Sequence, residues 1–460
     1  MKTKKPNIIL INCDDLGYGD LGCYGSELNK TPYIDTLANE GMKFTDFYMA
    51  SAVCSPSRGA MLTGCYPPRI GFGEFDGRAV LFPGQGCGLN PEERTIATQL
   101  KSTGYSTKII GKWHCGDQPE FLPTRFGFDE YFGIPFSNDM GRQSNYVPQR
   151  FPPLPLVQNE TVVQEQPDQR VLTERYTAEA CNFFEHHKED PFFLYFAHMH
   201  VHVPIFVPKC FLENSDNGGY GAAVEEIDWS VGVIMDKLDQ LGLRGNTLII
   251  FTSDNGSRAL GEGGSNSPCR GNKGKTWEGG MRVPCIMRWP EVIAAGQSNT
   301  ELATAMDFFA TLSHISGAQL PDDRVIDSKN IYPLMMDTSS KSEMEYFGYY
   351  WRDELQAIRC GDWKLHLWRD QCEVKELYNL REDIGERNNL YSHYPDLIVE
   401  MEGKAQKLRQ DVGDTAKSIK GKNRRSKGIV ENPKSLTVYR KDYPYMVAEY
   451  DLADMPVMTG

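Results

Sequence analysis

Apolar runs of strand length alternate with amphipathic segments over the first two-thirds of this 460-residue chain. Four of these runs are IILIN, TKII, FFLYFA and TLIIFT, and segments with a helical apolar period of about 3.6 residues lie between them. Strands that are separated by helices form a mostly parallel sheet with helices on both faces. The sequence therefore predicts an α/β fold in which helices sandwich a large, mostly parallel sheet.

Polar residues follow each of the four runs at the same relative place. Because the carboxyl ends of parallel strands meet at one edge of a sheet, and ligands bind there, we expect a single active site at that edge. The residues concerned are Asp14 and Asp15 after the first run, Lys112 and His114 after the second, His202 after the third, and Asp254 and Asn255 after the fourth.

Three carboxylates and one amide in this set offer only oxygen ligands. Asp14 and Asp15 form one pair and Asp254 and Asn255 the other. A single aspartate at a strand end more often caps a helix or a turn, but two matched pairs favour a metal site. Oxygen ligands suit a hard cation such as Ca²⁺ or Mg²⁺ rather than zinc. The sequence therefore predicts a site for a hard divalent cation.

Cationic and proton-carrying side chains accompany the carboxylates. Arg58, Lys112 and Lys273 are suited to binding the oxygens of an anion. His198, His200 and His202 lie close together after the third run, and histidine carries protons near neutral pH. Any one of the three taken alone is more often an ordinary packed or exposed residue. Their cluster indicates acid–base chemistry on an anionic substrate.

The pattern changes after residue 340. The segments MEYFGYYW, LQAIRCGDWKLHLW and KELYNL are typical of short antiparallel strands, and PDLIVEMEGKAQKLRQDV is typical of a helix. We therefore expect a catalytic α/β domain over residues 1–340. A smaller C-terminal α+β domain with a tail is expected over residues 341–460.

Charge and composition argue against several classes of partner. The formal net charge is −13, which disfavours nucleic acid and anionic membrane surfaces as partners. No apolar run approaches the about 20 residues of a membrane span. The twelve cysteines form no CxxC pair, and the apolar run behind MKTKKP ends in Cys13-Asp14-Asp15 rather than in a cleavage site. We therefore expect a cytoplasmic protein with reduced thiols.

Cys54 begins the segment CSPSRGAMLTG, in which Pro56 and Arg58 follow closely. A buried structural thiol is the commonest fate of a cysteine. A thiolate phosphatase needs its arginine farther along the loop, where Ala60 stands here. A thiol protease has no use for an oxygen-ligated metal. None of these alternatives explains the proline and the arginine.

The segment resembles the signature of the type I, formylglycine-dependent sulfatase family, which belongs to the alkaline-phosphatase-like superfamily. DDLGYGDLGCYG, GKWHCG, HVHVP, FTSDNG and KGKTWEGGMRVP resemble the other conserved blocks of the family and occur in its order. The resemblance covers most of residues 6–335 and, more weakly, the C-terminal region through LYNLREDIGERNNL. Within the family it is strongest to the arylsulfatase A and N-acetylgalactosamine-6-sulfatase branches.

The resemblance implies that Cys54 is not used as a thiol. A formylglycine-generating enzyme recognises Pro56 and Arg58 and oxidises the cysteine to an aldehyde. The hydrate of this aldehyde then attacks the sulfur atom of the substrate. Ca²⁺, with Mg²⁺ as the alternative, is bound by oxygen ligands beside it. The implied metal ligands are Asp14, Asp15, Asp254 and Asn255, together with the formylglycine made from Cys54.

The same resemblance implies roles for the remaining residues. Arg58 and Lys112 hold the hydrated aldehyde, and His114 takes a proton from it. Lys273 and His202 contact sulfate, and His202 protonates the leaving alcohol. Further contacts are expected from Ser137 to sulfate and from His200 to the substrate.

The resemblance predicts hydrolysis of sulfate esters, by exo-acting attack on sulfated amino sugars such as N-acetylgalactosamine sulfate in glycosaminoglycan fragments. Loops 71–90 and 137–170 and parts of the C-terminal domain are expected to select the sugar. A phosphonate monoester or phosphodiester hydrolase of the same superfamily is one alternative. A non-catalytic sulfoglycan-binding protein with an unconverted Cys54 is another.

Overall fold

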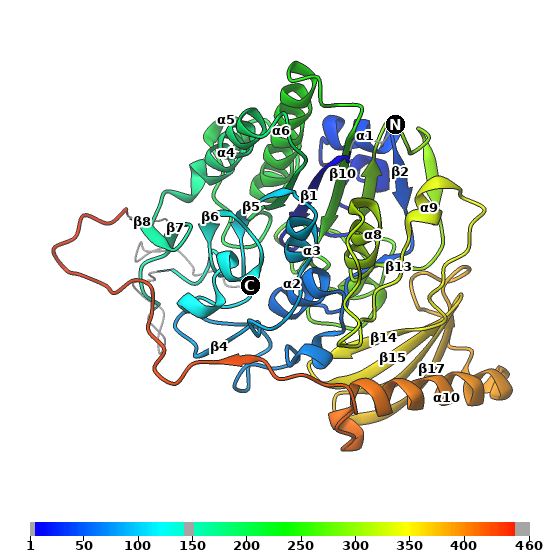
Figure 1. Cartoon of the computed structure of the whole chain (residues 1–460). Helices are drawn as coiled ribbons and strands as arrows, with labels where there is room; N and C mark the ends of the chain where they lie inside the picture. Colours follow the sequence, from blue (N-terminus) through cyan, green and yellow to red (C-terminus); the bar gives the residue numbers. More distant parts are fainter. Residues whose placement is uncertain (1–4, 142–150, 447–460) are drawn as a thin grey trace.

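A ten-stranded sheet runs through the larger part of the molecule (Figure 1). The structure, a computed structural model, describes residues 5–141 and 151–446. In spatial order the strands are β12 (Gln297–Asn299), β2 (Met42–Phe44), β11 (Cys285–Arg288), β10 (Thr247–Ser253), β1 (Asn7–Cys13), β9 (Phe192–Ala197), β5 (Ser106–Lys112), β6 (Glu130–Ile134), β7 (Pro155–Gln158) and β8 (Thr161–Glu165).

The central strands β10, β1, β9, β5 and β6 are parallel, as predicted. Antiparallel pairs flank them on both sides, at β10–β11 and β11–β2 and at β6–β7 and β7–β8. Only Asn159 and Glu160 join β7 to β8, and a two-residue connection cannot carry a parallel crossover. The sheet is therefore mixed, with a parallel centre that holds the predicted strand ends.

Helices cover both faces of this sheet. Ile9 and Ile11 of β1 pack toward one set of helices, and Ile8 and Leu10 pack toward the other. Because successive residues of a strand point to opposite faces, a strand covered on both faces is apolar throughout. The first set is α1 (Pro32–Asn39), α4 (Leu172–His186) and α6 (Gly218–Gln240), and the second is α2 (Cys54–Thr63), α3 (Ile96–Ser102) and α8 (Asp307–Ser316).

Shorter elements complete the larger part of the fold. Within residues 5–141 and 151–446, no helix combines the length and the apolar character that a membrane span requires. The remaining short elements are α5 (Lys209–Leu212), α7 (Glu278–Met281), α9 (Tyr332–Met336) and the paired strands β3 (Phe47–Tyr48) and β13 (Ala303–Thr304).

A small antiparallel sheet with one long helix forms the C-terminal part, as predicted. The elements are β14 (Phe347–Trp351), β15 (Glu354–Cys360), β16 (Trp363–Arg369), β17 (Cys372–Asn379) and α10 (Pro395–Val412). The chain then returns along the larger part, where β18 (Gly428–Ile429) pairs with β4 (Cys87–Gly88) (Figure 1). The domain boundary at residue 340 stays a prediction.

Buried charges join the two parts of the molecule. Glu278, at the start of α7, accepts hydrogen bonds from Tyr349 (2.9 Å) and Lys364 (3.0 Å) of the small sheet and from Tyr48 of β3. Burial raises the pKa of Glu278, but Lys364 and Arg282 outweigh burial and hold this pKa well below its usual range. The carboxylate is therefore ionised inside the interface.

Lys364→Met is expected to lower the free energy of unfolding by about 3–5 kcal/mol, because Glu278 and Glu386 lose a cation 3.0 Å away and stay buried. Urea denaturation measures the effect. Lys341→Met is the matched control, since Lys341 is 82 % exposed and its pair with Glu301 contributes about 1 kcal/mol or less. Equal losses in the two variants would contradict the prediction.

Candidate active site

Four strand ends converge at one edge of the sheet. Cys13 of β1 pairs with Ser253 of β10, and the Asp254 amide donates to the Cys13 carbonyl at 3.0 Å. The His198 amide, just after β9, donates to the Asn12 carbonyl at 3.0 Å. Lys112 ends β5, the neighbour of β9. The parallel register therefore brings together residues that are up to 240 positions apart.

Oxygen-bearing side chains cluster at this edge. Ligand atoms of Asp14, Asp15, Cys54 and His202 all lie within 4.8 Å of one another, and all four residues are buried. The Asn255 amide donates to Asp15 Oδ1 at 2.7 Å. Asp15 has a positive φ of 62°, which turns the chain at the strand end and lets its own amide donate to Asp254 Oδ1 at 3.2 Å.

Each of three carboxylates faces a nearby cation, and Asp14 faces two, since Arg58 Nη2 also lies 3.9 Å from Asp14 Oδ1. Lys112 donates to Asp14, and Lys273 donates to Asp15 Oδ2 at 2.9 Å. Arg58 reaches Asp254 Oδ2 through Nε and Nη2, both at 2.8 Å.

The pKa values of two of these carboxyls shift in opposite directions. Burial raises the pKa of Asp14, but Lys112, with His202 and Arg58, outweighs burial and holds it well below its usual range. Burial, followed by repulsion from Asp14, raises the pKa of Asp254.

The donor set fits a hard divalent cation. Oδ1 of Asn255 is buried and has no hydrogen-bond partner among the described residues, so an oxygen donor is left available next to the carboxylates. Carboxylate and amide oxygens are the ligands that Ca²⁺ and Mg²⁺ prefer. Because the lysines and the arginine already balance the three carboxylates, a divalent cation leaves the site positive and suited to an anionic substrate.

Cys54 is the first residue of α2 and is 1 % exposed. Its Sγ lies 3.4 Å from Asp14 Oδ1. Burial, followed by the charge of Asp14, raises the pKa of the Cys54 thiol well above its usual value. A thiolate nucleophile needs a lowered pKa, so the surroundings of Cys54 do not favour the thiolate alternatives.

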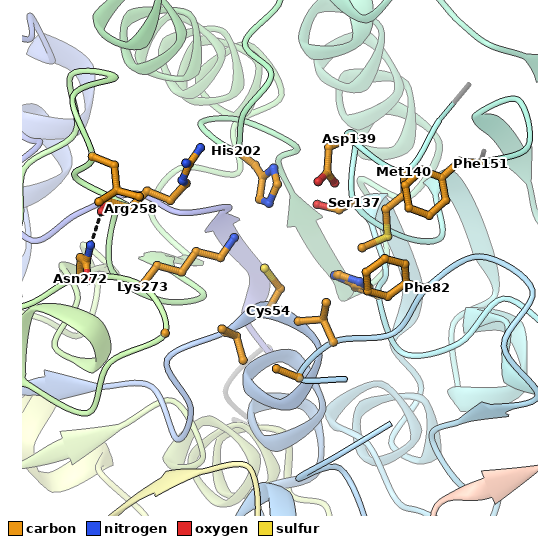
Figure 2. Close-up of a pocket in the computed structure, with 16 residues that line it drawn as sticks. Cys54, Phe82, Ser137, Asp139, Met140, Phe151, His202, Arg258, Asn272 and Lys273 are labelled. Carbon is orange, nitrogen blue, oxygen red and sulfur yellow. Dashed lines mark hydrogen bonds between the residues drawn. The ribbon is translucent and has the colours of Figure 1, made fainter. Parts of the chain in front are cut away.

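A cavity of about 520 Å³ opens beside Cys54 (Figure 2). Cys54, His202 and Lys273 point toward one another at its charged end, as Figure 2 shows. A volume of about 300–1,000 Å³ is typical of sites for small ligands. Further lining residues are His114 and Ser137, the apolar side chains of Phe82, Met140 and Phe151, and the polar side chains of Asp139, Arg258 and Asn272.

His114 and Ser137 line the same cavity as Cys54. The Lys112 ammonium donates to Ser137 Oγ at 3.2 Å. His114 Nε2 donates to the Leu81 carbonyl at 3.0 Å, and its Nδ1 is buried without a partner in the described part of the chain. Burial, followed by the charge of Lys112, lowers the pKa of His114, so the ring is neutral with Nδ1 unprotonated.

His200 does not line the cavity that Cys54 lines. Its Nε2 lies 3.6 Å from Glu226 Oε2 on α6, inside the layer between sheet and helix. This differs from the place expected for a residue that points into the substrate pocket. β9 ends at Ala197, and the segment after it does not continue as an extended strand, in which residues two apart would face the same side. His202 can therefore line the cavity while His200 contacts Glu226 of α6. Its contact with substrate stays a prediction.

The cavity wall draws on the two expected loops and on a third segment. Ala79, Val80 and Phe82 come from loop 71–90, and Ser137 and Phe151 are among those from loop 137–170, of which residues 142–150 lie outside the described part of the structure. The described residues after 340 contribute none of its lining. The sequence patterns did not indicate Arg258 and Asn272, which also line the cavity. The position of Arg258 in SDNGSR, directly behind a predicted strand end, was the available signal.

Comparisons with known proteins identify the family to which this chain belongs. The sulfatase family profile matches residues 6–318, and the profile for the C-terminal region of N-sulphoglucosamine sulphohydrolase matches residues 272–411. N-acetylgalactosamine-6-sulfatase of Rattus norvegicus is 42% identical over 380 residues, which cover 79% of this chain and 71% of that protein. Arylsulfatase A of Homo sapiens is 38% identical over 430 residues, which cover 84% of each.

Two further similarities come from another relative and from a solved structure. Steryl-sulfatase of Homo sapiens is 38% identical over 431 residues, covering 78% of this chain and 74% of that protein. The crystal structure of Ps i-CgsB in complex with k-i-k-neocarrahexaose has a TM-score of 0.78 at 31% identity, covering 88% of this chain and 92% of that one. With a family match over more than half of its length, this chain belongs to the sulfatase family and is an enzyme that hydrolyses sulfate esters.

Proposed function

We propose that this sulfatase removes the sulfate ester from a terminal sulfated amino sugar, such as N-acetylgalactosamine sulfate, in glycosaminoglycan fragments. The observation that carries the proposal is the cavity of about 520 Å³, with its reactive groups gathered at one end and apolar side chains along its wall. Such a cavity suits one end of a small fragment, and the apolar wall suits the carbon face of a sugar ring.

The nucleophile in this proposal arises from Cys54. A hydrated formylglycine at this position, which is typical of the family, supplies an oxygen that attacks sulfur. Lys112 and Arg58 hold the hydrate from the protein side. The unprotonated Nδ1 of His114 accepts the proton of the second hydroxyl, whose oxygen re-forms the aldehyde as the C–O bond to sulfate breaks and sulfate leaves. Lys273 and Ser137, which line the cavity from opposite sides in Figure 2, bind the sulfate oxygens.

We further propose Ca²⁺ as the bound ion, with Mg²⁺ as the alternative. Asp14, Asp15, Asp254 and Asn255 would hold it next to residue 54. Asp14 and Asp15 have ligand atoms within 4.8 Å of Cys54 Sγ, and Oδ1 of Asn255, which has no partner among the described residues, supports the place of Asn255 in the set. When bound, the ion supplies positive charge that offsets the charge of the sulfate oxygens.

His202 is proposed to protonate the leaving alcohol through Nε2. The short contact of its Nδ1 with the Val203 carbonyl fixes the ring, because a carbonyl oxygen can only accept, and Nε2 faces Asp15 at 3.8 Å on the cavity side. Nε2 therefore has a proton to donate when the ring is an imidazolium, the form that the Asp15 carboxylate favours. His202→Ala is expected to lower kcat/KM for a sugar sulfate by about 10²–10³-fold and for 4-nitrophenyl sulfate by less than about tenfold, because nitrophenolate leaves without a proton.

Steady-state kinetics on the two esters measures this difference. His186→Ala, an exposed histidine on α4, serves as the matched control and leaves both rates unchanged. If His202→Ala slows both esters equally, His202 is not the proton donor.

A substrate panel tests the proposed function. N-acetylgalactosamine and glucosamine sulfates with defined positions, a steryl sulfate and an aryl phosphonate are compared at equal enzyme concentration. We expect the highest kcat/KM on a sulfated amino sugar. The steryl sulfate is included because steryl-sulfatase is as similar as arylsulfatase A and the cavity has an apolar wall. A higher kcat/KM on the steryl sulfate or on the phosphonate would contradict the proposed substrate.

A further inference from the structure

Arg258 lines the cavity but belongs to none of the ion pairs around Cys54. Its guanidinium has no hydrogen-bond or ion-pair partner among the described residues, and the residue is half-buried. In Figure 2 the side chain extends toward His202, from the side opposite to Asp139. A cation therefore faces the cavity with its donors directed at whatever occupies it.

The backbone that carries Arg258 is held in place. The Asn272 side chain donates to the Arg258 carbonyl at 2.6 Å, and the Lys273 amide donates to the Ser257 carbonyl at 3.0 Å. The buried side chain of Asn266 bonds both polar backbone groups of Ser257, at 2.8 Å and 2.9 Å. Because the backbone is ordered before a ligand arrives, binding loses less conformational entropy.

The other cations of the site are already matched. Arg58, Lys112 and Lys273 each contact a carboxylate of the cluster, and Lys273 also lies at the sulfate end of the cavity. Arg258 contacts none of these carboxylates. A planar guanidinium donates two parallel hydrogen bonds to a carboxylate or a sulfate, and a partly desolvated site strengthens them.

We infer that the preferred substrate carries a second anionic group, a carboxylate or a second sulfate, which Arg258 binds while the reacting sulfate lies between Cys54 and Lys273. The inference deepens the proposed function and rests on it, since it concerns the sugar that bears the reacting sulfate. Arg258 is assigned to specificity rather than to the chemical step. Phe82, Met140 and Phe151 form the apolar wall, which suits the face of the sugar ring but does not distinguish charged from uncharged substituents.

Binding to the full-length, metal-loaded Cys54→Ala protein tests the inference without turnover. Isothermal titration calorimetry compares N-acetylgalactosamine 6-sulfate, N-acetylgalactosamine 4,6-disulfate and a glucuronyl-N-acetylgalactosamine 6-sulfate disaccharide. We expect one of the two doubly anionic sugars to bind at least tenfold more tightly than the monosulfate. Preference for the disulfate identifies a sulfate as the second anion, and preference for the disaccharide identifies a carboxylate.

Arg258→Gln, introduced into the Cys54→Ala protein, is expected to abolish this preference. Arg258→Lys in the same background is expected to keep part of it, because lysine retains the charge without the paired donors. Lys341→Gln, an equal charge change at a residue 82 % exposed, is the matched control and keeps the preference. Near-ultraviolet circular dichroism verifies the fold of each variant.

Two results would overturn the inference: no preference for either doubly anionic sugar, including no binding at all, or a preference that survives Arg258→Gln. Turnover of the monosulfate by the wild-type enzyme is measured separately. If the monosulfate is turned over but no binding preference is found, only the role of Arg258 is contradicted. If a preference depends on Arg258 but no sugar sulfate is turned over, only the proposed function is contradicted.

Discussion

Cys54→Ala is expected to lower kcat for a sulfate ester by about 10⁴-fold or more, because it removes the atom from which the nucleophile is made. The fold should persist. Among the described residues the Cys54 thiol makes one hydrogen bond, a long one of 3.4 Å to Asp14, and loss of one buried sulfur costs about 1 kcal/mol. Kinetics with an aryl sulfate and a thermal melt measure the two effects.

Cys285→Ala is the matched control for this variant. Cys285 is a fully buried cysteine in β11, away from the cavity lining, and its loss should leave kcat unchanged. Intact-mass spectrometry of the peptide that contains residue 54 provides the companion measurement, because conversion of a thiol to an aldehyde lowers its mass. Full activity in protein whose Cys54 is entirely a thiol would contradict the assignment of the nucleophile.

Asp254→Ala is expected to remove the bound divalent cation and to lower kcat/KM by about 10³-fold. The same change leaves Arg58 buried without the carboxylate that its Nε and Nη2 contact at 2.8 Å, so we also expect a loss of about 3–5 kcal/mol in unfolding free energy. Metal content is measured by inductively coupled plasma mass spectrometry. Activity is measured after chelation and after return of Ca²⁺ or Mg²⁺.

Asp228→Ala separates metal loss from simple destabilisation. Asp228 is a buried aspartate on α6 that accepts hydrogen bonds from the Tyr33 and Ile34 amides and does not line the cavity. Its loss should lower stability while metal content and kcat at low temperature stay unchanged. If Asp254→Ala retains a full equivalent of metal, Asp254 is not a ligand.

Most of the central fold followed from local patterns. The runs that became β1, β5, β9 and β10 are apolar because helices cover both faces of the sheet, and such strands are recognisable without their partners. The flanking strands were less predictable. The hairpin of β7 and β8 and the three-residue strand β2 carry too few residues for a periodic signal.

Within the site, predictability depended on whether a residue's place follows from the backbone alone. Asp14 and Asp254 directly follow paired strands, so their proximity was a consequence of parallel register. The pairing of Arg58 with Asp254 did not follow from register, because it requires α2 to pack across the strand ends. The direction of His200 toward Glu226 likewise depends on how α6 covers the sheet.

The amino-acid order by itself determined the alternation of strands and helices, the oxygen donors at the strand ends and the motif around Cys54, because periodicity and residue type act over short stretches of chain. Only the tertiary structure decided which cation faces which carboxylate and which side chains line the cavity. It also decided which of the cavity's cations, Arg258, has no charged partner among the described residues. Ion pairing and cavity shape depend on distances between segments that are remote in sequence, and packing sets those distances.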